Sequence, residues 1–97
     1  MAIMNTEKKS GTAHAIFGTG AGHLISAGIC GGADAATLIV YDNTSAAGTV
    51  ICKLGVGIGL SATFTPAVPI AFGTGLYFEL TGTTPVIFGA WIGPKAA

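Results

Sequence analysis

Apolar and polar residues alternate with a period of two along most of the chain, which is the pattern of β-strands. Short runs rich in β-branched and aromatic residues are separated by Gly, Pro, Asn and Asp, the residues that favour turns. The pattern predicts strands at residues 13–17, 22–30, 37–42, 48–54, 60–65, 67–72, 76–81 and 86–92. Eight short antiparallel strands with a turn about every ten residues predict a small all-β fold, a jelly-roll-like or Greek-key β-sandwich.

Turns and the N-terminal segment complete this outline. Turns are predicted at residues 42–48, 73–75 and 82–85, and the first should join two antiparallel strands. Residues 1–12 hold three of the eight charged residues. We expect them to form a polar N-terminal arm and residues 13–97 to form a single sandwich domain, because 97 residues suit one core.

Several predicted strands are apolar on both faces. Residues 76–81 have one apolar and one polar face, whereas residues 86–92 and 37–42 have two apolar faces. A sandwich this small buries one face of each sheet, so a second apolar face predicts a subunit interface. Scattered surface apolar residues are the alternative interpretation. The predicted interface residues are Trp91, as the anchor, with Ile87 on the same face, and Tyr41, Ile39 and Tyr77.

The composition supports a surface that another molecule covers, and it argues against nucleic acid and anionic membranes as partners. Charged residues make up 8% of the chain, about a third of the usual share, while 51% of residues are hydrophobic. Lys and Arg number four, as do Asp and Glu, so there is no excess of basic residues. The chain is therefore not expected to bind nucleic acid or an anionic membrane.

Candidate chemistry along the sequence is sparse. His14 and His23 would need two ligands from Cys30, Cys52, Asp34 and Asp42 to hold zinc, at spacings that match no compact metal motif. The glycine-rich segments 18–22 and 55–59 are not followed by a helix, so they favour tight bends over phosphate binding. Asp42 falls in a predicted turn and Glu79 on an outer face, and Arg is absent. We therefore expect no catalytic residue, no metal and no cofactor, and no enzyme activity.

Targeting features are weak. The apolar stretch at residues 15–30 is interrupted by His23 and four glycines, which disfavours a signal peptide. The stretch at residues 50–72 contains Lys53, Pro66 and Pro69, which disfavours a membrane span. We expect synthesis in the cytoplasm with two reduced thiols, although a bridge between Cys30 and Cys52 stays open.

The middle and end of the chain resemble small β-rich structural proteins of tailed bacteriophages. The residues that carry the resemblance are TLIVYDNTS at 37–45, GTVI at 48–51, AFGTGLY at 71–77 and TGT at 81–83. The resemblance covers residues 22–92 and is to head decoration or cement proteins, which sit on the outside of an icosahedral shell. This chain is richer in Gly and Ala and poorer in charge than those proteins.

The resemblance implies a function and partners. It implies a non-enzymatic virion protein on the capsid surface that binds the shell of major capsid protein and stabilises the assembled head, as a homotrimer or homodimer. We hypothesise that residues 1–12 order on a neighbouring subunit or on the shell. The alternative is a carbohydrate- or receptor-binding module of a tail or fibre, in which Tyr41, Tyr77 and Trp91 would line a groove.

Overall fold

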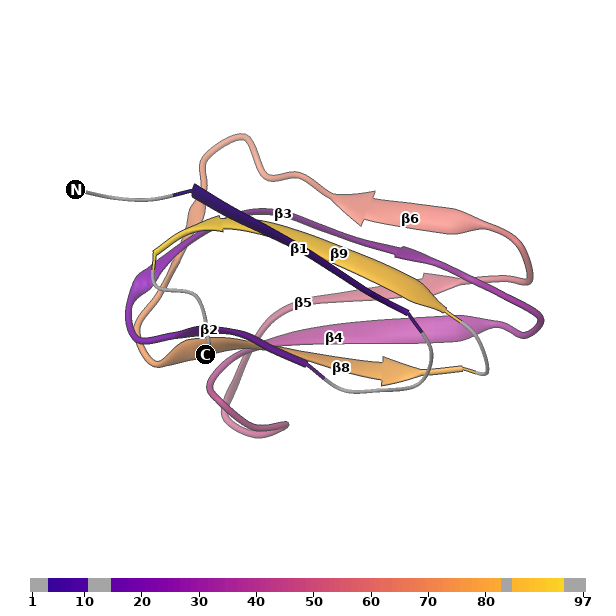
Figure 1. The fold of residues 1–97 in the computed structure, drawn as a ribbon, viewed down its shortest axis with the longest axis horizontal. Coiled ribbons are helices and arrows are strands. Elements are labelled where there is room, and N and C mark those ends of the chain that lie inside the picture. Colours follow the sequence, from indigo (N-terminus) through magenta and orange to yellow (C-terminus); the bar gives the residue numbers. More distant parts are fainter. Residues whose placement is uncertain (1–3, 11–14, 83–84, 94–97) are drawn as a thin grey trace.

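The computed structural model describes residues 4–10, 15–82 and 85–93, and these form a two-layer β-sandwich (Figure 1). Its strands are β1 (Met4–Ser10), β2 (Ala15–Thr19), β3 (Gly22–Cys30), β4 (Ala36–Asp42), β5 (Thr49–Val56), β6 (Ser61–Phe64), β7 (Ile70–Phe72), β8 (Gly75–Thr81) and β9 (Val86–Ile92). Every strand pairing is antiparallel. The predicted all-β sandwich is confirmed.

The strand order identifies the sandwich as a jelly roll. Sheet A has the order β1-β9-β3-β6, and β7 also pairs with β3, on the edge that β6 occupies further along. Sheet B has the order β2-β8-β4-β5. The pairs β4–β5, β3–β6, β2–β8 and β1–β9 are nested like the two arms of one long hairpin. Rolling such a hairpin into two layers gives the jelly roll, one of the two predicted alternatives.

The N-terminal segment differs from the predicted polar arm. Residues Met4–Ser10 form β1, which pairs with β9 without interruption from Ile92 to Val86. Backbone hydrogen bonds hold such a strand whatever its side chains are, and charged residues are common on sheet edges. The rest of the predicted arm, residues 1–3 and 11–12, lies outside the described residues.

Two further predicted strands and one turn agree with the structure, and another predicted strand is shorter than expected. The bounds predicted for β3 and β9, at 22–30 and 86–92, match the observed strands, and the turn at 42–48 joins β4 to β5. The strand predicted at 67–72 is shorter, because β7 begins only after Pro69. The described part of the chain contains no helix long and apolar enough to cross a membrane.

The core lies between the sheets and, for the side chains the structure describes, is entirely apolar. Alternation along β4, β8 and β9 sends one side chain of each consecutive pair into it. β3 contributes Leu24, Ala27 and Ile29 on the two sides of a register shift between Leu24 and Ser26. The buried hydrophobic residues are Leu24, Ala27, Ile29, Ala36, Leu38, Val40, Phe72, Leu76, Phe78, Leu80, Ile87 and Trp91.

Two of the predicted interface residues belong to this core. Trp91 and Ile87 are both 0% exposed, and their register partners on β3 are the core residues Leu24 and Ile29. Because both faces of β9 are apolar, alternation could not select the inner face; burial of the largest ring decides it. The prediction that Trp91 and Ile87 face a partner is therefore wrong in this fold.

Candidate functional site

The outer face of sheet B presents three cross-strand rows of side chains from β8, β4 and β5. The first row holds Thr81, Thr37 and Gly55, the second Glu79, Ile39 and Lys53, and the third Tyr77, Tyr41 and Val50. Strand alternation places these positions opposite the core, as predicted for Tyr41, Ile39 and Tyr77. The three predicted residues therefore lie together on one half-exposed surface.

The tyrosine row is fixed by contacts within the sheet. The hydroxyl of Tyr41 donates a hydrogen bond to Oε1 of Glu79 at 2.8 Å, and the rings of Tyr41 and Tyr77 lie 6.3 Å apart with a tilt of 57°. The hydrogen bond to Glu79 raises the pKa of Tyr41, with smaller contributions from burial and from the nearby negative charge. The pair thus presents two positioned rings beside a carboxylate.

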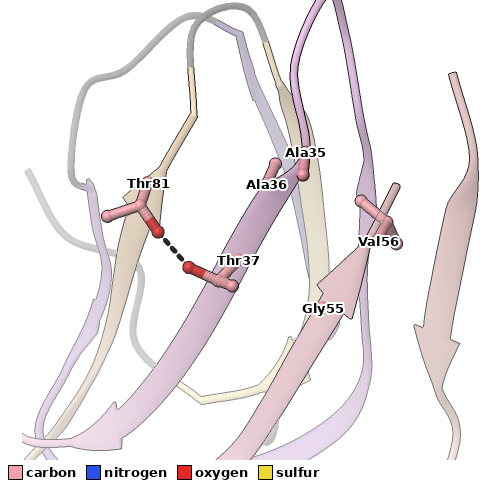
Figure 2. A pocket seen from close by; sticks show the side chains of 6 residues that line it. All are labelled: Ala35, Ala36, Thr37, Gly55, Val56 and Thr81. Carbon is pink, nitrogen blue, oxygen red and sulfur yellow. Dashed lines mark hydrogen bonds between the residues drawn. The ribbon is translucent and has the colours of Figure 1, made fainter. Parts of the chain in front are cut away.

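A shallow hollow lies at the other end of this face, around the threonine row (Figure 2). The hydroxyls of Thr37 and Thr81 are hydrogen-bonded to each other. Gly55 leaves the hollow open, because a Cβ at this position would meet only Cγ2 of Thr37, at 3.9 Å. The lining residues are Ala35, Ala36, Thr37, Gly55, Val56 and Thr81, none of which is charged.

The outer face of sheet A has a different chemistry. Strands β3, β6, β7 and β9 contain no Asp, Glu, Lys or Arg. On β9 the outer positions alternate with Trp91 and include Phe88 and Ala90, both half-buried. The ring of Phe88 covers Gly28 on β3, where a Cβ would lie 2.2 Å from Cε1 of the ring. The outer face of these strands is uncharged and combines apolar residues, such as Phe88 and Ile92, with small polar ones, such as Ser26 and Thr63. Sequence reasoning missed it because it assigned the anchor role to the opposite face of β9.

Asp42 connects two loops at one end of the sandwich. Its carboxylate accepts backbone N–H hydrogen bonds from Gly73 at 3.0 Å, Thr74 at 2.8 Å and Gly75 at 3.4 Å. Desolvation raises the pKa of Asp42, but the three donors together lower it further, so the net pKa lies below its ordinary value. The predicted turn role of Asp42 therefore includes a long-range clamp, which the local sequence did not reveal.

The candidate metal and nucleophile residues are dispersed. Cys30 is exposed and Cys52 is half-buried, and both are free thiols in the structure. Burial raises the pKa of the Cys52 thiol to about 11. Within residues 4–10, 15–82 and 85–93, no three His, Cys, Asp or Glu side chains come together as a metal site. His14 lies outside the described residues.

Comparisons with known proteins add the following. No protein-family model matches the chain, and no curated protein matches it in sequence. Among solved structures, a chain of the Bacillus endospore appendages, described as "a novel family of disulfide-linked pili", is similar over 100% of this chain and 92% of its own length. The TM-score is 0.48 and the identity 18%, a level of similarity that carries no argument about function.

Proposed function

We propose that the protein is a non-enzymatic structural subunit that packs the outer face of sheet A against another protein surface. The observation that carries the proposal is the lack of charge on β3, β6, β7 and β9, whose outer face presents Phe88, Ala90 and Ile92 beside small polar side chains. Removing the apolar side chains of this face from water stabilises a complex by about 25 cal/mol per Å² of apolar surface buried.

The resemblance of residues 37–45 and 71–77 to tailed-phage structural proteins makes a capsid decoration or cement protein our specific proposal for this subunit. Its partner would be a shell of major capsid protein, and its location the virion surface. A subunit that binds only the assembled shell stabilises that shell by mass action. Such a role needs a rigid scaffold and a contact face but no catalytic group.

The test is cosedimentation of the purified protein with heads assembled from the major capsid protein encoded in the same genome. Ala90→Lys places a charge on the outer face of sheet A, and Ile39→Lys places the same charge on the outer face of sheet B. We expect saturable binding that Ala90→Lys weakens at least about tenfold and Ile39→Lys leaves unchanged. Failure of the unaltered protein to bind, or loss of binding only in Ile39→Lys, would contradict the proposal.

A carbohydrate- or receptor-binding module is the second candidate. The observation that favours it is the pair formed by Tyr41 and Tyr77 beside Glu79, since aromatic rings with an adjacent carboxylate suit a sugar ring and its hydroxyls. Binding to a glycan panel that Tyr77→Ala abolishes, with an unchanged circular dichroism spectrum, would support this candidate over the capsid role.

A further inference from the structure

The loop of residues 57–60, between β5 and β6, presents two large aliphatic side chains to solvent. Ile58 is 68% exposed and Leu60 is 63% exposed. Removing such aliphatic side chains from water is favourable, so both are available to stabilise a contact.

Backbone hydrogen bonds hold this loop in position. The N–H of Gly31 donates to the carbonyl of Leu60 at 2.7 Å, and the N–H of Gly59 donates to the carbonyl of Gly32 at 3.3 Å. Within the loop, the N–H of Leu60 donates to the carbonyl of Gly57 at 3.2 Å. The loop is therefore tied to the connection between β3 and β4, and an ordered loop loses little conformational entropy on binding.

The hollow on sheet B lies next to this loop. Val56, the last residue of β5, lines the hollow and leads directly into the loop. Ala35, which also lines it, belongs to the same β3–β4 connection that holds the loop. The two turns lie at the same end of the molecule (Figure 1), so an apolar projection and an uncharged hollow are neighbours on one surface.

We propose that two copies of the chain associate at this end about a two-fold axis, with the 57–60 loop of each copy seated in the hollow of the other. A two-fold contact requires a self-complementary patch, and this end carries both halves of one. Had the loop and the hollow lain at opposite ends, the same contact would have been head-to-tail and would have produced a ring or an open filament. This dimer goes beyond the proposed function, which concerns the outer face of sheet A.

Sedimentation equilibrium of the full chain from about 1 to about 500 μM tests the proposal. Ile58→Asp places a charge on the projecting loop, and Gly55→Glu fills the hollow at a position where a side chain meets no close neighbour. Val68→Asp is the matched control, because Val68 is 76% exposed in the loop between β6 and β7. We expect a dimer that Ile58→Asp and Gly55→Glu each weaken at least about tenfold and that Val68→Asp leaves within about twofold.

Several results would overturn the two-fold contact. They are a protein that stays monomeric throughout this range, a dimer unaffected by both loop and hollow variants, and equal weakening by Val68→Asp. Circular dichroism checks the fold of each variant, and Ile58→Ser replaces Ile58→Asp if the latter unfolds. Ala90→Lys should dimerise like the unaltered protein, so a failed capsid experiment and a failed dimer experiment are distinguishable.

Discussion

Asp42 shows how a single carboxylate can connect segments about thirty residues apart in this sequence. It ends β4, and three consecutive backbone N–H groups, from Gly73 after β7 to Gly75 at the start of β8, donate to it. A charged acceptor with several donors makes hydrogen bonds stronger than neutral ones. The clamp fixes the start of β8, a strand that carries three core residues.

Replacing Asp42 with Asn removes the charge while keeping the side chain's size. We expect the free energy of unfolding at pH 7 to fall by about 1–2 kcal/mol, as measured by urea denaturation. Lys53→Gln, which also removes one charge but at an exposed position of β5, should change it by less than about 0.5 kcal/mol. Equal effects of the two substitutions would contradict the clamp.

The same carboxylate predicts part of the response to acid. Because the pKa of Asp42 is lowered in the folded protein, its stabilising contribution is present above the unfolded value of about 3.9. That contribution is lost as the pH falls through the lower, folded pKa. The difference in stability between the unaltered protein and Asp42→Asn should therefore narrow as the pH falls below about 4.

The two thiols should differ in reactivity. With a pKa of about 11, Cys52 is a thiolate in only about one molecule in a thousand at pH 8, and it packs against the core. Cys30 is exposed. In dilute folded protein we expect a disulfide reagent such as DTNB to label Cys30 rapidly and Cys52 only after unfolding, with Cys30→Ser removing the fast phase.

At the scale of elements, a substitution in β9 tests whether the face of this strand that carries Trp91 lies in the core. Trp91→Ala should lower the free energy of unfolding by about 3–5 kcal/mol, since the ring is fully buried. Tyr77→Ala, on the outer face of sheet B, should cost much less. Thermal unfolding of both variants compares them, and a small effect at Trp91 would contradict its place in the core.

Gly31 lies where the connection between β3 and β4 contacts the 57–60 loop. A Cβ at Gly31 would lie 2.4 Å from the carbonyl oxygen of Gly57, a backbone atom that cannot move without displacing the 57–60 loop. Gly31→Ala should therefore destabilise the fold by about 1–3 kcal/mol. Gly73→Ala, where nothing lies within 4 Å, serves as the control and should be nearly neutral. The same denaturation curves measure both.

The sequence was most informative for elements bounded by clear turns. Alternation placed β3 and β9 correctly and separated the inner face of β8 from Tyr77 and Glu79, because one face of β8 is polar. It could not orient β9, where both faces are apolar, and so it misplaced Trp91. It also missed β1, since a polar edge strand is stabilised by backbone pairing that leaves no apolar pattern.

The candidate surfaces were predictable only in part. Tyr41 and Tyr77 were expected on outer faces, but their proximity depends on the pairing of β4 with β8, two strands far apart in the sequence. The hollow and the Asp42 clamp depend on such long-range pairing as well. Register between distant strands is set by the packing of the whole sandwich, which no local window contains.

At the scale of the whole molecule, β1 supplies the only Asp, Glu, Lys or Arg residues among the described strands of sheet A. It covers the edge of β9 with a segment that contains Glu7, Lys8 and Lys9. Removing residues 1–10 would expose a neutral edge strand, which is a template for pairing with other chains. We expect the shortened protein to aggregate at concentrations where the full chain stays dispersed, as measured by light scattering.

A second variant separates the strand from its charges. Replacing Glu7, Lys8 and Lys9 together with Ser keeps a segment able to pair with β9 but removes all three charges. If backbone pairing is what protects the edge, this variant should scatter light less than the shortened protein. Scattering as strong as that of the shortened protein would assign the protection to charge instead.

The nested pairing also determines the order in which the strands can pair while the chain is being synthesised. The ribosome adds about 5–20 residues per second, so β1 waits about 4–16 s until β9, the one described strand with which it pairs, has been made. The hairpin of β4 and β5 can close early, whereas β3 lacks one neighbour until β9 has been made. The nascent chain therefore carries an uncharged, half-paired β3 until β9 emerges, and completion of sheet A depends on that strand.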